Sequence, residues 1–265
     1  MNRSTQVAVI TGAASGIGEG LAREAARRGM SVVLADVDAE RLAAVADSIG
    51  SAATALPTDV ANSSSAEALA ERVYARHGQV DLLFNNAGVL STGFSWEIPE
   101  KRWNQALDVN VGGVVNGLRA FVPRLLAAQR PARIINTSSV GGFLPAPMMA
   151  PYSATKFAIV ALTESLAGEL RMLKSSIEVS LLAPGPVVSG IFREAAPEAS
   201  RSFVEQLSQY NNAHGLTPMQ FAPLVFDAID RGDYWIIPQP EILDQGLPER
   251  FDMIRQRKAP YFAFF

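Results

Sequence analysis

The stretch VITGAASGIGEG, residues 9–20, places Gly12, Gly16 and Gly18 between an apolar run and an alanine-rich segment. Each glycine costs conformational entropy on folding, so the chain must need close backbone approach at this junction. A glycine-rich turn from a strand into a helix lets backbone N–H groups and the positive helix end approach a pyrophosphate. The spacing G-x-x-x-G-x-G therefore predicts a dinucleotide-binding turn, although such a turn can also hold glycines for packing alone.

Short β-rich runs alternate with longer helical patterns on both sides of this turn, which is typical of a parallel sheet. The predicted strands are residues 6–10, 31–35, 53–56, 80–85, 133–137, 177–182 and 234–237. The predicted helices are residues 16–28, 39–49, 64–77, 99–129, 152–173 and 217–231. The strands are continuous apolar runs, which indicates that helices cover both faces of the sheet. We predict an α/β fold: one Rossmann-type doubly wound domain over residues 1–265, with a seven-stranded parallel sheet in the order 3-2-1-4-5-6-7.

Two segments interrupt the alternation. Residues 189–215 are predicted to form a lid over the substrate, and the proline-rich residues 238–265 a C-terminal tail at the edge of the site. His214 is expected to lie in a loop within the first segment.

Composition limits the classes of partner. The 23 basic and 26 acidic residues give a net charge of −3 with no long charged block, which argues against nucleic acid or a membrane surface. The chain has no cysteine and two histidines, so we expect no disulfide, no thiolate catalysis and no metal site. No signal peptide or membrane-spanning run is found, which predicts a soluble cytoplasmic protein.

Asp36 indicates which dinucleotide binds. It ends the second predicted strand, 18 residues after Gly18, close to the roughly 20 residues at which an acidic side chain accepts hydrogen bonds from the ribose diol. A 2′-phosphate would meet this carboxylate, and neither Ser15 nor Val37 supplies a positive charge. We predict NAD rather than NADP, while a solvated turn residue or a helix cap stays open for Asp36.

A second group of residues carries the chemistry of alcohol oxidation. Tyr152 and Lys156 are four residues apart at a helix start, and so share one face. A phenol has a pKa of about 10, and an ammonium within about 5 Å favours the phenolate. Ser138 and Ser139 follow the fifth predicted strand, at the edge where such sheets bind ligands. A serine there can hydrogen-bond the substrate oxygen while Tyr152 takes or gives its proton. An ordinary helix pair and strand-end turn chemistry are the alternatives.

Taken together, the chain resembles the short-chain dehydrogenase/reductase family over almost its whole length. The motifs that carry the resemblance occur in the family's order: T-G-x-x-x-G-I-G at 11–18, Asp59-Val60, N-N-A-G at 85–88, Asn110 in DVNVGG, Ser139, Tyr152, Lys156 and Pro184-Gly185. The resemblance implies a catalytic tetrad of Asn110, Ser139, Tyr152 and Lys156. Ser139 is preferred to Ser138 because the family places its serine 13 residues before the tyrosine.

The resemblance also implies how the cofactor is bound. Lys156 would bind the nicotinamide ribose, and Asn110 would help to hold a water that relays protons. The implied cofactor-binding residues are Gly12, Ser15, Gly16, Ile17, Gly18, Asp36, Asp59, Val60, Asn86, Ala87, Gly88, Tyr152, Lys156, Pro184, Gly185, Val187 and Ser189. In the family the helices predicted here at 103–129 and 152–173 form dimers and tetramers, so a homo-oligomer is expected.

Two departures from the family pattern are visible. Ser189 stands where the family usually has threonine, and retains a hydroxyl. The usual D-G-G turn after the last strand is replaced by DYWIIPQPEILDQG, which argues against a ketoacyl reductase of the fatty-acid type.

Apolar residues predominate near the expected pocket, and subunit or core contacts are the alternative role for each of them. They are Leu90, Phe94, Trp96, Phe143, Leu144, Met148, Met149, Val188, Ile191 and Phe192. Arg193 lies among them as a possible partner for a carboxylate. We predict an NAD-dependent dehydrogenase for a hydrophobic secondary alcohol or ketone that is aromatic, alicyclic or steroid-like. An NADP-dependent ketoreductase and a catalytically inactive NAD-binding protein are the alternatives.

Overall fold

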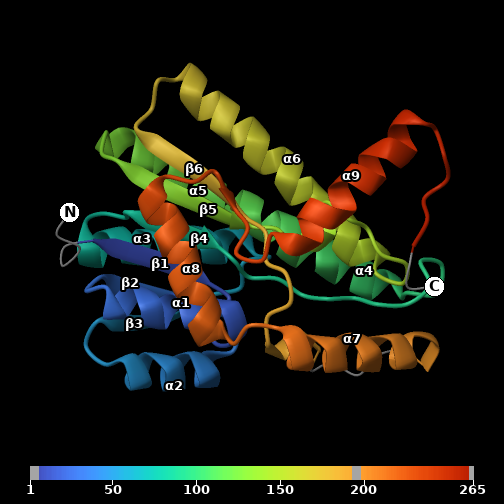
Figure 1. Ribbon diagram of the computed structural model, residues 1–265. Helices are drawn as coiled ribbons and strands as arrows, with labels where there is room; N and C mark the ends of the chain where they lie inside the picture. The colour runs from blue at the N-terminus through green and yellow to red at the C-terminus, as the bar shows by residue number, and fades with distance from the viewer. Residues whose placement is uncertain (1–5, 193–197, 263–265) are drawn as a thin grey trace.

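The computed structural model describes residues 6–192 and 198–262 and contains a seven-stranded parallel sheet (Figure 1). The strands are β1 (Val7–Thr11), β2 (Ser31–Asp36), β3 (Ala53–Pro57), β4 (Leu82–Asn85), β5 (Ala132–Thr137), β6 (Ile177–Leu182) and β7 (Trp235–Ile236). Their order is β3-β2-β1-β4-β5-β6-β7, and every pairing is parallel. The predicted fold class and strand order are therefore confirmed.

Helices surround this sheet. They are α1 (Gly16–Arg27), α2 (Ala39–Ile49), α3 (Ser63–His77), α4 (Glu100–Leu107), α5 (Gly113–Ala128), α6 (Ala150–Met172), α7 (Arg201–His214), α8 (Pro218–Arg231) and α9 (Glu241–Arg255). Most of their bounds lie within one or two residues of the predicted ones, as expected where hydrophobic periodicity is strong.

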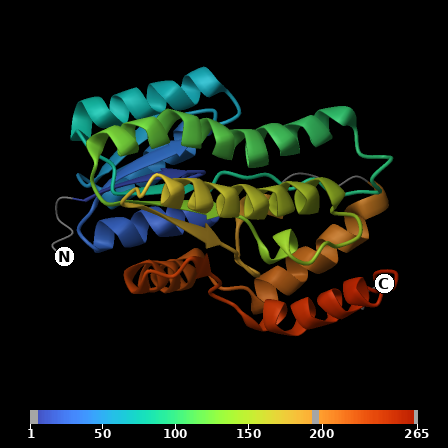
Figure 2. The same ribbon diagram turned by 90° about the horizontal axis from the view of Figure 1, so that it is seen from above.

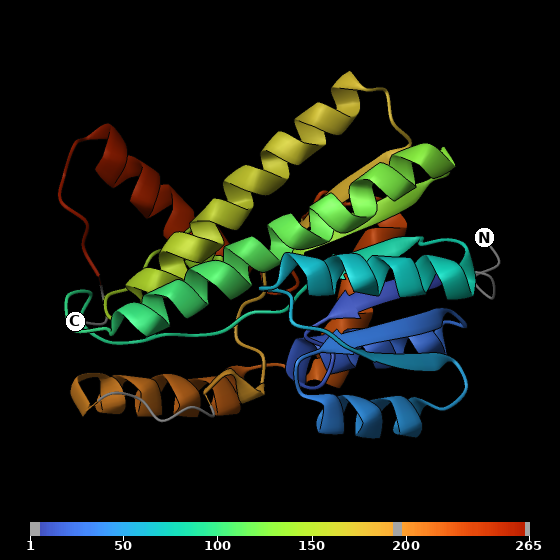
Figure 3. The ribbon, with the colours of Figure 1, turned by 180° about the vertical axis from the view of Figure 1, so that it is seen from behind.

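The two faces of the sheet bury separate cores. Ala8 and Ile10 of β1 point into a cluster with α1, α2 and α8, whereas Val7 and Val9 point into a cluster with α3, α5 and α6. Successive side chains of a strand alternate between faces, so a continuous apolar strand serves both cores. Seen from above and from behind, α3, α5 and α6 form one outer layer and α1 and α8 the other (Figures 2 and 3).

One predicted helix is interrupted. Residues 99–129 were expected to be a single helix, but α4 and α5 are separated by a π-helical turn, Asp108–Gly112, with Asn110 at its centre. The Asn110 carboxamide is bonded to Val89 on both its oxygen and its nitrogen. These tertiary bonds hold the extra residue of the turn, and local helix propensity contains no sign of them.

The two segments that interrupt the alternation contain helices of their own. Residues 189–215 include α7, so His214 is the last residue of a helix rather than a loop residue. The tail includes α9, which continues through Pro248 although proline removes a backbone donor. Burial of Leu243 and packing of Arg250 over the Phe157 ring, at 5.2 Å, hold α9 against the body. Both α7 and α9 lie beyond the carboxyl ends of the strands (Figures 1 and 3).

Over the described ranges, no helix has the length and apolar content needed to span a membrane.

Candidate active site

The glycine turn after β1 leaves no space for side chains at its glycine positions. Gly12 and Gly16 have φ of +69° and +56°, a region that disfavours other residues. A Cβ on Gly12 would lie 2.8 Å from Ala87 Cα, and one on Gly18 would lie 2.0 Å from the Gly12 carbonyl oxygen. Helix α1 can therefore begin directly against the turn only because these positions carry no side chain.

The start of α1 keeps polar groups available to a ligand. Ser15 is the N-cap residue, yet its hydroxyl makes no capping hydrogen bond, and Ile17 packs against the adjacent core. The helix therefore presents backbone N–H groups and a hydroxyl at its positive end, an arrangement that suits an anion.

Asp36 lies beside this turn at the end of β2. One carboxylate oxygen accepts from the Ala14 N–H and the other from the Asp38 N–H, each at 3.0 Å. These bonds fix the carboxylate against the turn, and each oxygen retains a further acceptor position. The nearby Arg41 pairs with Asp38 at 3.4 Å rather than with Asp36.

The N-N-A-G segment after β4 is tied to the same turn by Thr11. The Thr11 hydroxyl accepts from the N–H groups of Asn86 and Ala87, at 2.9 and 3.1 Å, and donates to the Phe84 carbonyl. The Asn86 carboxamide donates to the Thr11 carbonyl at 3.0 Å. The sequence motif contains Thr11 but gave it no separate role, and in the structure its hydroxyl joins the ends of β1 and β4.

Asp59 and Val60 shape the loop after β3. The Asp59 carboxylate accepts from the Ala61 N–H at 3.0 Å, and Asn116 of α5 donates to the Val60 carbonyl at 2.8 Å. Gly113 allows Val60 to approach, since a Cβ there would lie 2.8 Å from a Val60 methyl group. The loop is thus fixed close to the end of the sheet by α5.

Lys156, Tyr152 and Ser139 are brought together at the carboxyl ends of β4 and β5. Lys156 is buried and donates to the Thr137 carbonyl at 3.0 Å, with its Nζ 5.6 Å from the centroid of the Tyr152 ring. Ser139 lies beside the same ring, since a Cβ on Gly141 would be 3.4 Å from Tyr152 Cε1 and 3.6 Å from Ser139 Oγ. Gly88 lies close by, because a Cβ on it would be 3.4 Å from Lys156 Nζ.

The two adjacent serines have different surroundings. Ser138 is buried and donates to the Lys156 carbonyl at 2.8 Å, so its hydroxyl holds helix α6 against β5. The Ser139 oxygen accepts from Gly141 N–H at 3.1 Å and faces Tyr152. Of the two, Ser139 is the serine whose hydroxyl lies beside the Tyr152 ring.

Asn110 supports this group from behind. Its carboxamide donates to the Thr155 hydroxyl at 3.0 Å, and Thr155 donates to the Tyr152 carbonyl at 2.8 Å. Together with its bonds to Val89, this leaves the Asn110 side chain engaged within the protein. Thr155 lies between the predicted Tyr152 and Lys156, and its helical position four residues before Ile159, on the buried side of α6, was the available signal.

The ionisation of the pair differs from the expectation. Burial raises the pKa of the Tyr152 phenol, with the Ser139 hydrogen bond opposing the rise, and burial lowers the pKa of Lys156 to about 8. Lys156 was predicted to lower the phenol pKa. In the protein without cofactor the pKa of Tyr152 is instead raised, because burial is the largest cause acting on both groups.

The loop after β6 completes the site. Pro184 accepts from Val140 N–H at 3.0 Å, and Gly185 donates to the side chain of Gln239 at 3.2 Å. Val187 N–H makes no hydrogen bond to any residue that the structure describes. Ser189 lies against the glycine turn, since a Cβ on Gly16 would be 2.9 Å from its Cβ. The predicted residues from the two halves of the chain therefore converge on one edge of the sheet.

The expected apolar wall is only partly assembled. Phe94 and Trp96 stack at 5.2 Å on an exposed loop, whereas Phe143 packs edge-on against Trp235 of β7 at 5.9 Å. Leu90, Leu144, Met148, Met149, Val188 and Ile191 are partly buried. Phe143 is thus a packing residue, while Arg193 and the side chain of Phe192 lie outside the described residues.

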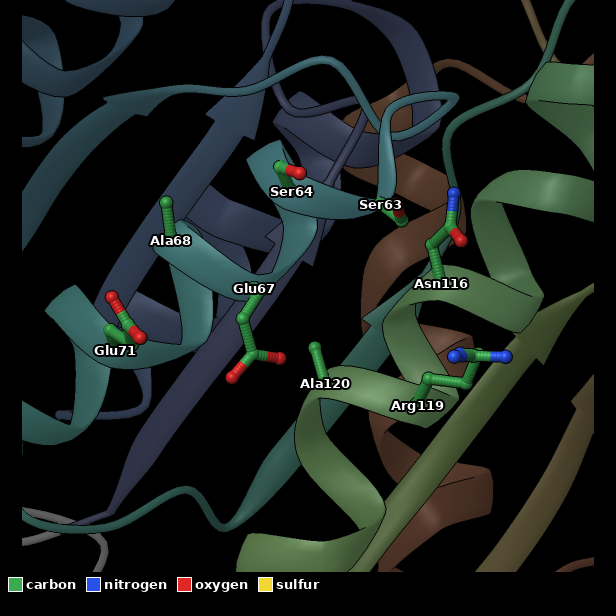
Figure 4. Close-up of a pocket in the computed structure, with 8 residues that line it drawn as sticks. All are labelled: Ser63, Ser64, Glu67, Ala68, Glu71, Asn116, Arg119 and Ala120. Atoms are coloured by element: carbon green, nitrogen blue, oxygen red, sulfur yellow. The ribbon is translucent and has the colours of Figure 1, made fainter.

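A separate polar hollow lies between α3 and α5 (Figure 4). It is lined by Ser63, Ser64, Glu67, Ala68, Glu71, Asn116, Arg119 and Ala120. None of the predicted site residues lines it.

Comparison with known proteins agrees with this geometry. The family model described as short chain dehydrogenase matches residues 6–200. The chain belongs to this family. It is accordingly a short-chain oxidoreductase with a Rossmann-type dinucleotide fold.

Three relatives show how far the similarity extends. The chain is 40% identical over 200 residues to a 1-deoxy-11-beta-hydroxypentalenate dehydrogenase of Streptomyces exfoliatus, covering 72% of each chain. It is 34% identical to a C alpha-dehydrogenase of a Sphingobium species, covering 96% of this chain and 87% of the relative. A short-chain dehydrogenase/reductase from Burkholderia phymatum, solved in complex with NAD, superposes with a TM-score of 0.94 at 37% identity, covering 99% of this chain and 98% of that one.

Proposed function

We propose that this short-chain oxidoreductase transfers hydride between NAD and a hydrophobic secondary alcohol or ketone. The observation that carries the proposal is the contact of Ser139, Tyr152 and Lys156 beside the glycine turn. A proton donor, a hydrogen-bond donor and a buried cation at this edge of the sheet form a site for carbonyl and alcohol chemistry that needs no metal ligand.

The residues fit a dinucleotide at this edge. A side chain at Gly12 or Gly18 would close the turn, and the N–H groups of α1 lie directly behind it. In this proposal Gly12, Ser15, Gly16, Ile17 and Gly18 hold the pyrophosphate.

Other segments would hold the two ends of the cofactor. Asp36 would bind the adenosine ribose, and Asp59 and Val60, with Asn86 to Gly88, the adenine side. Lys156 and Tyr152 would bind the nicotinamide ribose, and the segment from Pro184 to Ser189 would flank the nicotinamide. The Val187 N–H, which has no partner among the residues that the structure describes, suits an amide oxygen there.

The preference for NAD rests on charge. Asp36 is fixed against the turn by two backbone donors, so a 2′-phosphate could not displace it without breaking those bonds. The similar structure from Burkholderia phymatum was solved with NAD, which supports the same choice.

When bound, NAD supplies an acceptor for the hydride that leaves the carbinol carbon. Tyr152 takes the hydroxyl proton of the alcohol, or returns it in the reverse direction, while Ser139 hydrogen-bonds the same oxygen. Lys156 places a positive charge beside the phenol, which stabilises the phenolate relative to the same buried site without a cation. Asn110 acts on this group by positioning α6 through Thr155, and the proton-relaying water implied by the family stays a prediction.

The proposed substrate is alicyclic or aromatic. The partly buried residues around the site are mainly aliphatic and sulfur-containing side chains, which suits an apolar ring system. One relative is named as a dehydrogenase of a hydroxypentalenate and the other as a C alpha-dehydrogenase, and both names are consistent with dehydrogenation of an alcohol. Helix α7 is proposed to cover the substrate.

A screen of alicyclic and aromatic secondary alcohols, with NAD and NADP at equal concentrations, tests the proposal. We expect reduction of NAD with at least one of them, and a preference for NADP would show that the role given to Asp36 is wrong. Tyr152→Phe should then lower turnover by about 100-fold or more without loss of NADH binding. Binding of NADH with no turnover of any substrate by the wild-type protein would favour an inactive NAD-binding protein.

We also propose that the protein is a homo-oligomer, a tetramer or dimer, assembled through α5 and α6. The outer face of α6 carries small residues, including Ala154, Ala161 and Gly168, that are exposed in the single chain. Sedimentation should show a particle larger than the 28.4 kDa chain, and a monomer at micromolar concentration would contradict the proposal.

A further inference from the structure

The loop at residues 184–188 has few backbone donors of its own. Its sequence is Pro-Gly-Pro-Val-Val, so two of its first three residues have no N–H group. Such a segment cannot form a regular strand ladder on both sides, because each proline lacks the N–H group that would donate to a neighbouring strand. Donors from elsewhere in the chain have to fix its path.

Gln239 supplies both a donor and an acceptor to this loop. Its side-chain oxygen accepts from the Gly185 N–H at 3.2 Å, and its side-chain nitrogen donates to the Pro186 carbonyl at 2.6 Å. The carboxamide thus pairs with the loop as a peptide group of a neighbouring strand would. Gln239 stands between Pro238 and Pro240, where β7 ends and α9 begins, which fixes the position of its backbone.

Asn211 holds the same loop from the opposite direction. It is buried on α7, and its side-chain nitrogen donates to the Val187 carbonyl at 2.7 Å. The chain returning from α7 adds Leu216, whose N–H donates to the Pro186 carbonyl at 3.1 Å and whose carbonyl accepts from Val188 at 2.9 Å. Gly215 permits this approach, since a Cβ there would lie 2.3 Å from the Asn211 carbonyl oxygen.

The loop held in this way touches the reacting group. The Pro184 carbonyl accepts from the Val140 N–H at 3.0 Å and from the Ser139 hydroxyl at 3.5 Å. The carboxamides of Gln239 and Asn211 donate to the carbonyls of Pro186 and Val187. The N–H of Val187 has no partner among the described residues. The loop therefore offers one backbone donor at a position fixed by α7 and by the start of α9.

We propose that Gln239 and Asn211 are positioning residues for the nicotinamide half of the cofactor. They act through the loop at 184–188 and do not touch the reacting atoms. This inference rests on the proposed function, because it assumes that the loop flanks the nicotinamide. It also gives the C-terminal segment a role: α9 and its preceding Pro-Gln-Pro anchor the loop.

The test compares ligands that differ only in the nicotinamide end. Gln239→Met removes both hydrogen bonds at nearly constant side-chain length, and Gln245→Met changes an exposed glutamine of α9 as the control. Asn211→Leu removes the bond to Val187, and Asn212→Leu changes its exposed neighbour. NADH and ADP-ribose dissociation constants are measured by titration for all four variants and the wild type.

We expect Gln239→Met to weaken NADH binding by about tenfold, and Asn211→Leu by somewhat less, with ADP-ribose binding unchanged and both controls like the wild type. Gln239→Glu should not restore binding, because its carboxylate would face the Pro186 carbonyl without a donor. Equal weakening of NADH and ADP-ribose, or no weakening of either, would overturn the inference.

Amide hydrogen exchange in the wild-type protein tests the same inference if the variants do not fold. Amide exchange at Gly185 should be slow without ligand, and exchange at Val187 should be fast until NADH is added. Slow exchange at Val187 without ligand, or fast exchange at Gly185, would contradict the assignment. If the wild-type protein binds ADP-ribose but neither NADH nor NADPH more tightly, the proposed function itself is wrong.

Discussion

The glycine turn after β1 and the loop at residues 184–188 reach the same edge of the sheet but are held in opposite ways. The turn takes its shape from missing side chains, because a Cβ at Gly18 would lie 2.0 Å from a carbonyl oxygen of the same turn. The loop takes its shape from two added side chains, Gln239 and Asn211, which reach it from distant parts of the sequence. Adding atoms should therefore damage the first region, and removing them should damage the second.

The catalytic group between these regions depends on one buried charge, which gives the largest expected effect. Lys156→Met keeps the length of the side chain and removes the ammonium, so the cation beside Tyr152 is lost. We expect kcat to fall by about 1000-fold. Stopped-flow measurement of NADH formation checks this, with Lys174→Met on the exposed chain after α6 as the control. Turnover within about threefold of the wild type would contradict the role given to Lys156.

The glycine turn should fail when a methyl group is added. Gly18→Ala is expected to destabilise the protein by about 3 kcal/mol, since overpacking here meets backbone rather than a flexible side chain. Gly112→Ala is the matched control, because the nearest atom to its Cβ position is the Leu107 carbonyl oxygen at an ordinary 3.7 Å and its backbone is helical, with φ of −55°, so it should cause no loss of stability. Urea unfolding measures the difference in unfolding free energy between the two variants. Equal values would show that the turn relaxes to accept a methyl group.

The buried ammonium should also make stability depend on pH. Burial lowers the pKa of Lys156 to about 8, so between that value and its unfolded pKa of about 10.4 the unfolded chain binds more protons than the folded one. The free energy of unfolding therefore gains about 2 kcal/mol from this group between about pH 7.5 and pH 9.5.

Lys156→Met has no ammonium at this position, so its free energy of unfolding should lack this gain. The measurement is the difference in unfolding free energy between wild type and variant at the two pH values. A difference that does not change with pH would show that the folded and unfolded pKa values are alike.

The smallest effect is expected at Asp36, whose charge acts beside the turn without shaping its backbone. Asp36→Asn retains an oxygen for the Ala14 N–H and removes the negative charge. The ratio of kcat/KM for NADP to that for NAD should rise by about tenfold, as a repulsion of about 1.4 kcal/mol is lost. Asp47→Asn on the exposed side of α2 is the control. An unchanged ratio would mean that the charge of Asp36 does not select the cofactor.

Much of the fold could be predicted because its determinants are local. Continuous apolar strands, amphipathic helices and the glycine spacing were sufficient for a doubly wound parallel sheet and for most element bounds, and the strand order is that of the Rossmann-type fold. The π turn at Asn110 and the helix α9 through Pro248 were missed, since each depends on contacts with residues far away in the sequence.

The candidate site divides in the same way. The family resemblance distinguished Ser139 from Ser138, and helical spacing placed Tyr152 and Lys156 on one face. The structure brings these three side chains together. The ionisation of the pair could not be obtained from spacing, because the pKa shifts arise from burial, which depends on the whole surrounding packing.

The sequence by itself determined where the backbone must come close, because glycine and proline restrict or release φ whatever surrounds them. It also determined which side chains share a strand end or a helix face, since those periodicities are fixed by backbone geometry. Only the tertiary structure decided that Gln239 and Asn211 meet the loop at 184–188, and that Lys156 is buried. Hydrogen bonds and desolvation act between residues that are distant in the chain, so they exist only after the sheet, α7 and α9 have packed together.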